Sequence, residues 1–308
     1  MTRFATFDEA SAVPFLEGQR VHIETAVNRA PLVEIQYPTL IPVDTSAHPW
    51  ADTVEFSSME GYGEADWING NDDEIPLAGT KRQRYRSSIG EAGIGYAFGY
   101  AEMEKAALYG INLSADDAIA ARRAAQEMVE RVALRGDVRK GLSGLFNHTA
   151  IIPEGALNGD WSTATADEML ADVNEALTAP MLATNYIAMA NTILLSPERM
   201  HIIGTRRLGD TTMTVLQWLL ANNVYTLTTG QPLLMRAVHG LSTAGVGGTQ
   251  RMIAYRRDPE VLKLHFPMPH RFLPAREMGA LRYVVPGIMR LGGLDIRRPS
   301  EVAYRDGI

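Results

Sequence analysis

Two groups of side chains in this sequence could carry chemistry: a serine with a nearby histidine, and a short acidic run. Ser143 and His148 could serve a hydrolase as nucleophile and base. The Gly-x-Ser-x-Gly pattern is absent, and closeness in sequence does not make a triad, so a soluble hydrolase is kept only as an alternative. Asp72, Asp73 and Glu74 could hold a hard cation. Their spacing does not match a calcium loop, and we favour a solvated acidic turn.

The sequence shows no motif for other metal sites or for cofactor binding. The chain has no cysteine, which excludes disulfides, thiolate metal sites and cysteine nucleophiles. Its seven histidines are scattered without an HExxH or HxH spacing, so no zinc site is expected. A P-loop and a dinucleotide fingerprint are also absent. We therefore expect no catalytic residue, no cofactor and no metal, which favours a structural role.

The most regular charged pattern is Arg82, Arg84 and Arg86. In a strand, this alternation places all three guanidinium groups on one face. Arginine makes forked, planar contacts and tolerates partial desolvation, so it suits protein interfaces. We expect these arginines and the acidic turn to contact an adjacent copy of the chain. The alternative, a solvated hairpin face, stays open.

A long hairpin and a long helix would position these side chains. Turn formers, including Asn69-Gly70, separate a strand starting at 53–56 from a return strand near 80–89, and predict a hairpin within 51–100. Ser114 as N-cap and Gly136 as stop predict a helix over 114–135. Further helices are expected over 95–109, over 165–179 (stopped by Pro180) and from 210 or 211 to 222. Strands are expected over 32–37, 192–196, 224–227, 251–256, 281–285 and 294–298, with a strand or helical turn at 200–203. Helices and strands cluster instead of alternating, which indicates the α+β class.

Composition places the chain among globular proteins. It has 308 residues, 46% hydrophobic and 21% charged, with no apolar run of membrane-span length and no signal-peptide pattern at its start. The net charge is −7, but residues 1–80 carry −11 and residues 81–308 carry +4. This disfavours non-specific nucleic-acid binding and would suit binding between copies. Recurrent prolines in residues 1–50 predict an extended arm that gains its order on another surface.

Three stretches carry a resemblance to a known family. They are residues 118–147 with Arg122-Arg123 and Gly141-Leu142-Ser143-Gly144-Leu145-Phe146-Asn147, then Leu194-Leu195-Ser196-Pro197 with 211–223, and finally Gly292 to Pro299 with Tyr304 to Ile308. With the arm and hairpin in front, the chain resembles the major capsid protein of tailed bacteriophages and prophages, which has the Hong Kong 97-type fold. The resemblance implies an N-arm (1–50), an extended hairpin loop over a neighbouring subunit (51–100), a peripheral domain with a spine helix (101–190, helix 114–135), an axial domain (191–270) and return strands of the peripheral domain (271–308).

The resemblance also implies a function. The chain would be a structural protein, not an enzyme, that forms hexamers and pentamers of an icosahedral shell around phage DNA. It would assemble in the bacterial host cytoplasm and reside in the virion. Expected partners are other copies, a separate scaffolding protein or none, a portal and a decoration protein, with weakly contacted DNA and no membrane. An encapsulin-like nanocompartment shell is the alternative on the same fold.

Overall fold

The longest helix among the described residues, α4, spans Leu113–Arg135 and confirms the predicted long helix to within one residue. Ala125 and Val132 are buried, because they recur at helical spacing on one face. The helix ends before Gly136, where φ is 75°. A Cβ at this glycine would lie 2.2 Å from the carbonyl oxygen of Leu142, so the sharp turn that follows the helix requires glycine.

The structure is a computed structural model that describes residues 33–67, 76–109, 113–279 and 281–308. Residues 35–308 belong to one unit, and the account below concerns that unit. Its mixture of helices with four small sheets confirms the predicted α+β class. Within the described ranges, no helix is both long enough and apolar enough to cross a membrane.

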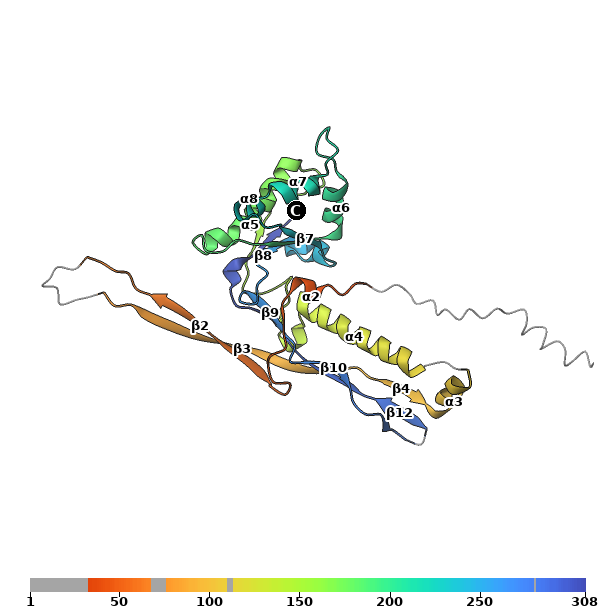
Figure 1. The fold of residues 1–308 in the computed structure, drawn as a ribbon. Coiled ribbons are helices and arrows are strands. Elements are labelled where there is room, and N and C mark those ends of the chain that lie inside the picture. Colours follow the sequence, from red (N-terminus) through yellow and green to blue (C-terminus); the bar gives the residue numbers. More distant parts are fainter. Residues whose placement is uncertain (1–32, 68–75, 110–112, 280) are drawn as a thin grey trace, which may run out of the picture. The chain divides into compact units, whose positions relative to one another are not determined.

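A five-stranded sheet carries most of the helices (Figure 1). Its order is β5 (Pro153–Gly155), β15 (Val302–Asp306), β8 (Arg251–Tyr255), β6 (Thr192–Leu195) and β7 (Leu234–Ala237). The pairs β5–β15 and β6–β7 are parallel, whereas β15–β8 and β8–β6 are antiparallel. The accompanying helices are α5 (Ala166–Ala183), α6 (Pro197–Thr205), α7 (Val215–Asn222) and α8 (Val224–Thr229).

This sheet separates two apolar cores. Ile193 and Ala254 pack with the core of α5, α6 and α7. Leu194 and Ile253, their neighbours in sequence, pack into the core that contains the buried face of α4. Successive side chains of a strand point to opposite faces, so both faces of this sheet are covered.

The other described strands form three smaller sheets. The first contains β1 (Val43–Asp44), β9 (Leu262–His265) and β14 (Leu294–Ile296). The second contains β10 (Met268–Phe272), β13 (Gly287–Gly292), β3 (Gly79–Gly93) and β2 (Thr53–Tyr62), and the third contains β11 (Arg276–Glu277), β12 (Arg282–Val285) and β4 (Tyr96–Gly99). The other helices in the described ranges are α2 (Tyr37–Leu40) and α3 (Tyr100–Tyr109), with short 3-10 turns η1 (Val138–Lys140), η2 (Leu241–Thr243), η3 (Val246–Gly248) and η4 (Pro299–Glu301).

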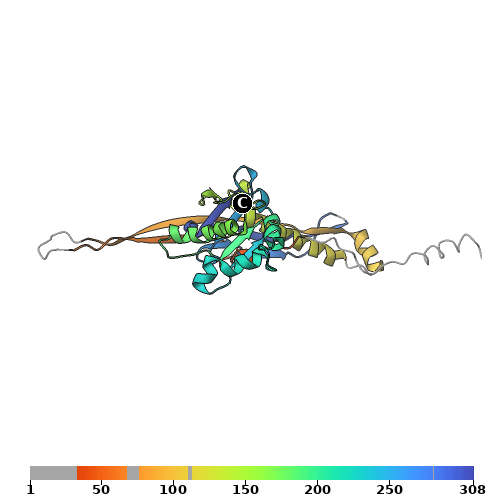
Figure 2. The ribbon, with the colours of Figure 1, turned by 90° about the horizontal axis from the view of Figure 1, so that it is seen from above.

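Strands β2 and β3 form the predicted hairpin. They pair antiparallel from Thr53 opposite Ser88 to Tyr62 opposite Gly79. Beyond that pairing, residues 89–93 of β3 join β13 and connect the hairpin to the rest of the unit. The hairpin and α4 point in opposite directions from the five-stranded sheet in both views (Figure 1, Figure 2).

Two predicted strands are wrong. Residues 224–227 lie in helix α8, because the Asn223 side chain accepts the backbone N–H of Thr226 at 2.8 Å and Gly230 closes the helix in the left-handed region. Residues 33–36 form no strand, and α2 begins at Tyr37. Residues 200–203 lie in α6, as the helical alternative predicted.

Three predicted helix boundaries also shift. α5 continues through Pro180 to Ala183, because a proline in the last turn removes only one late backbone hydrogen bond. α7 begins after Thr214, whose capping box with Gln217 fixes the start later than 210 or 211. Residues 96–99 pair with β12 as strand β4, so only the later part of the helix predicted over 95–109 is helical.

Part of the segment predicted as the N-arm, residues 1–50, packs on the folded body. Residues 1–32 lie outside the described part of the chain, but Leu40 and Ile41 are buried in the α4 core. The Tyr255 hydroxyl donates to the Leu40 carbonyl at 2.8 Å, and Lys263 donates to Asp44 at 2.7 Å. Residues 37–44 therefore belong to the folded body, because their apolar side chains and the β1–β9 pairing fix them there.

Strand pairing and helix packing connect residues from the three later predicted ranges, 101–190, 191–270 and 271–308. Helix α5 packs with the five-stranded sheet, although it precedes residue 191. Strand β15 joins this same sheet through β8 instead of returning with β10 to β14. An ion pair between Arg305 and Glu175, with 2.6 Å between Nη2 and Oε1, ties β15 to α5. These pairings link residues distant in sequence, which local patterns do not report.

Candidate assembly surface on the hairpin

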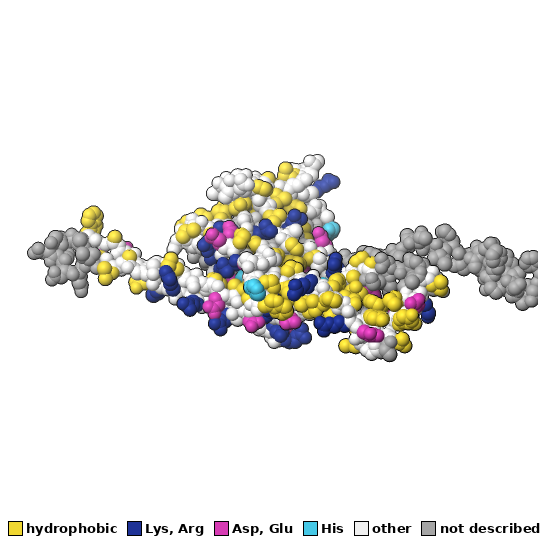
Figure 3. Space-filling model, turned by 60° about the horizontal axis from the view of Figure 1, so that its bottom comes forward, with side chains coloured by type: hydrophobic (Ala, Val, Ile, Leu, Met, Phe, Trp, Pro, Cys, Tyr) yellow, Lys and Arg dark blue, Asp and Glu magenta, His cyan; other side chains and the backbone are white. Residues whose placement is uncertain are grey.

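The hairpin register puts Arg82, Arg84 and Arg86 on one face, as the alternation predicts. Arg82 lies opposite Met59, and Arg86 lies opposite Glu55. Directly paired residues of an antiparallel ladder share a face. All three arginines are exposed, and Figure 3 shows Lys and Arg side chains along the described part of the hairpin. The structure thus brings the three predicted contact residues together.

These arginines differ in their counter-charges. The Nε atom of Arg86 donates to Oε1 of Glu55 at 2.8 Å, and both side chains are largely exposed. An exposed pair of this kind contributes only ~0–1 kcal/mol. Across the described ranges, Arg82 and Arg84 have no ion-pair partner. Two guanidinium groups therefore remain available for an acceptor on another molecule.

The opposite face of the hairpin is anchored to the body at its base. Phe56 and Tyr85 stack with ring centroids 5.0 Å apart, and the Arg297 guanidinium lies 4.5 Å from the Phe56 ring centroid. Sequence reasoning missed these residues. Their aromatic type was visible, but their pairing depends on the register, which no residue type reveals alone.

Toward the tip, the hairpin exposes large apolar side chains. The exposed fractions are 60% for Met59, 55% for Tyr62, 99% for Trp67 and 84% for Leu77. Groups of exposed apolar side chains mark interaction surfaces more often than scattered single ones do. The predicted acidic contact residues Asp72, Asp73 and Glu74 lie outside the described residues.

Ser143 and His148 line a hollow of about 330 Å³ beside the hairpin base. Burial lowers the pKa of His148, and its Nδ1 accepts the backbone N–H of Ala150 at 3.3 Å. In the described part of the chain, no hydrogen bond joins Ser143 to His148, and no carboxylate is hydrogen-bonded to His148. The geometry therefore gives no support to the hydrolase alternative.

A family comparison decides the class of this protein. The family model for the major capsid protein matches residues 63–308. The chain belongs to this family. A search of curated proteins finds no match. As a major capsid protein, the chain is a structural component of the bacteriophage head shell, as predicted, and the match favours this role over an encapsulin-like shell.

Solved structures share the fold of this major capsid protein. The capsid of Myoviridae phage XM1 is similar with a TM-score of 0.81 and 15% identity, over 94% of this chain and 98% of that chain. The capsid of a native GTA particle has a TM-score of 0.66 and 12% identity, over 98% and 99%. Mycobacterium phage Adephagia has a TM-score of 0.61 and 12% identity, over 98% of both chains. These similarities confirm the Hong Kong 97-type fold.

Proposed function

We propose that this subunit assembles through hexamers and pentamers into an icosahedral shell around phage DNA, and that the β2–β3 hairpin lies on a neighbouring subunit. The hairpin itself carries the proposal. Ten residues of β2 pair with β3, and most of their side chains are exposed. A two-stranded hairpin is marginal alone, so a neighbouring copy would supply its missing support.

Arg82, Arg84 and Arg86 are the proposed contact residues of that hairpin, with Asp72, Asp73 and Glu74 as candidates at its turn. Two of the arginines lack a counter-charge on their own chain within the described ranges. Each exposed pair with a neighbour would contribute only ~0–1 kcal/mol. Repetition over many symmetry-related copies makes such modest contacts sufficient for a closed shell.

The remaining parts take their roles from the same proposal. Residues 51–100 form the extended loop, and α4 is the spine helix of the peripheral domain. The five-stranded sheet with α5 to α8 is the axial domain, and the segment before α2 is the N-arm. The subunit acts without catalysis or a cofactor.

The wider setting of the shell belongs to the proposal as well. The subunit assembles in the host cytoplasm and then resides in the virion. A scaffolding protein, a portal and a decoration protein are further partners. The net charge of −7 favours only weak contact with the enclosed DNA.

Replacing Arg82, Arg84 and Arg86 together by Ala tests the contact. We expect a several-fold lower particle yield in electron microscopy, with the melting temperature of the unassembled subunit unchanged, because the three side chains are exposed. Arg139→Ala is the matched control, since Arg139 is exposed and pairs with Asp137 in its own turn. Wild-type yield from the triple variant would contradict the hairpin contact. A wild-type chain found only at monomer or dimer size, even with its scaffolding partner, would contradict the shell itself.

A further inference from the structure

The segment before α5 contains an asparagine followed by a glycine, Asn158-Gly159, the dipeptide in which an asparagine side chain deamidates most readily. Asn158 is exposed, and Gly159 has a φ of 75° with no atom within 4 Å of where a Cβ would lie. Because glycine has no side chain, nothing shields its backbone nitrogen from the preceding side chain. The groups that react in a deamidation are therefore both present in this segment.

Three hydrogen bonds hold Asn158 against α5. Its Nδ2 donates to the Glu168 carbonyl at 3.0 Å and to Oδ1 of Asp172 at 3.1 Å, and its backbone N–H donates to the same Oδ1 at 2.9 Å. Asp172 is only 1% exposed, and its other oxygen accepts the indole N–H of Trp161 at 2.8 Å. Both carboxylate oxygens of Asp172 are thus occupied, which fixes this acceptor beside Asn158.

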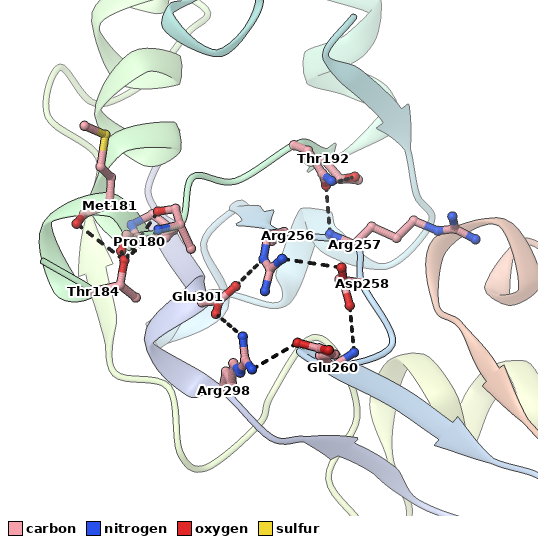
Figure 4. Close-up of polar contacts among 12 residues, drawn as sticks. Pro180, Met181, Thr184, Thr192, Arg256, Arg257, Asp258, Glu260, Arg298 and Glu301 are labelled. Carbon is pink, nitrogen blue, oxygen red and sulfur yellow. Dashed lines mark hydrogen bonds and ion pairs between the residues drawn. The ribbon is translucent and has the colours of Figure 1, made fainter. Parts of the chain in front are cut away.

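Helix α5 is closed at both ends. At its start, Thr165 and Glu168 form a capping box. At its end, the Thr184 hydroxyl donates to the Pro180 carbonyl at 2.7 Å, a contact that Figure 4 shows. Because the helix is held in this way, the preceding segment leaves it only by breaking its own hydrogen bonds, which is a local opening of the fold.

We infer that Asn158 is a deamidation site that Asp172 keeps closed while the segment lies on α5. In the reaction, the backbone nitrogen of Gly159 loses its proton and attacks Cγ of Asn158, which closes a cyclic succinimide, and the side-chain nitrogen leaves as ammonia. Water then opens the ring and gives aspartate or isoaspartate. Ring closure moves Cγ toward the backbone, so both hydrogen bonds of Nδ2 must break first.

The product carries a carboxylate where Asn158 has the donor Nδ2. It has no N–H for the Glu168 carbonyl, and it adds a negative charge beside the buried carboxylate of Asp172. Two adjacent carboxylates repel each other, and most strongly where water is excluded. The segment then no longer fits on α5, so a transient opening becomes permanent. This modification concerns the single subunit and does not depend on assembly.

Peptide mass spectrometry of the full-length subunit tests the inference, because deamidation changes the mass of the peptide. At mildly alkaline pH, we expect Asn158 to deamidate at least about tenfold more slowly in the folded subunit than in urea, since hydrogen bonds to a charged group must break first. Asn69-Gly70, the other Asn-Gly pair of the chain, provides an internal reference for the rate in the same urea sample. Equal rates at Asn158 in the folded and the unfolded chain would overturn the inference.

A substitution on α5 tests whether the protection comes from Asp172. In Asp172→Ala, the rate at Asn158 should rise several-fold toward its value in urea. Glu175→Gln is the matched control, because Glu175 also lies on α5 but pairs with Arg305. Equal acceleration in the two variants would overturn the role of Asp172. If Asp172→Ala does not fold, the comparison of the folded and urea-unfolded wild type still decides whether the site is closed.

A second pair of substitutions tests the effect of the product. Asn158→Asp and Asn158→Ala both remove the donors of Nδ2, but only Asn158→Asp adds a carboxylate beside Asp172. We therefore expect the lower melting temperature for Asn158→Asp at neutral pH. A melting temperature equal to or above that of Asn158→Ala would overturn the claim that the modification keeps the segment from returning to α5.

Discussion

At the scale of single residues, a buried ion pair fastens the last strand of the five-stranded sheet. Arg251 and Asp306 are paired with 2.6 Å between Nε and Oδ1, and their side chains are 6% and 10% exposed. The guanidinium also lies 4.6 Å from the Tyr304 ring centroid. A buried charge requires its partner, because removal of one leaves the other desolvated and unpaired.

Asp306→Asn should therefore destabilise the unassembled subunit by about 3 kcal/mol. Urea unfolding measures this change. Glu55→Gln removes the partner of Arg86 in an exposed pair and should cost no more than ~1 kcal/mol. Equal effects of the two substitutions would contradict the assignment of Arg251–Asp306 as a structural pair.

His148 gives the subunit a pH dependence. Burial lowers its pKa in the folded state, so as the pH falls the unfolded chain binds a proton more readily than the folded chain. His148 should thus reduce the free energy of unfolding progressively below the ordinary histidine pKa of about 6.5. His148→Gln should flatten this loss in urea unfolding series at different pH values. The exposed His239→Gln is the control, and an unchanged slope in His148→Gln would contradict the argument.

At the scale of elements, the hairpin depends on its anchor at Phe56. Phe56→Ala removes the stack on Tyr85 and the contact with Arg297. An aromatic pair is worth about 0.5–1.5 kcal/mol beyond its buried area, so hydrogen exchange of peptides within 53–62 should become faster in unassembled subunits. Met59→Ala on the exposed arginine face should leave the exchange unchanged. Equal protection in both variants would show that the base is held by other contacts.

Local sequence signals predicted the elements whose causes are local. The long helix followed from Ser114 as predicted N-cap and Gly136 as stop, and the hairpin from its turn formers and the strands on either side. The strand predicted at 224–227 was wrong. β-branched and aromatic residues favoured a strand there, but the Asn223 cap and Gly230 impose a helix. The helix end predicted at Pro180 was also wrong, because a proline in the last turn removes only one late backbone hydrogen bond.

At the scale of the whole molecule, contacts between residues distant in sequence determine the features that local sequence patterns do not predict. Leu40 and Ile41, within the predicted arm, are buried in the α4 core, and the pairing of β15 with β8 places the last strand in the five-stranded sheet. Within the candidate assembly surface, the three arginines were predictable because alternation alone places them on one face. The Arg297 contact was not, since tertiary packing creates it.

The division into a packed body and an exposed hairpin suits a shell subunit. Both faces of the five-stranded sheet are covered by apolar cores, which stabilise the body of the subunit. Among the described residues, the hairpin instead carries two arginines, Arg82 and Arg84, without an ion-pair partner, and it exposes large apolar side chains and buries little on its own chain. These groups suit contacts that form on assembly.

Electron cryo-microscopy of particles built from this chain tests the central claim most directly. Our account predicts that the β2–β3 hairpin, residues 53–62 and 79–88, lies across an adjacent subunit, with Arg82 and Arg84 facing acceptor groups of that neighbour. A closed shell in which each hairpin contacts only its own subunit, with both arginines facing solvent, would contradict it.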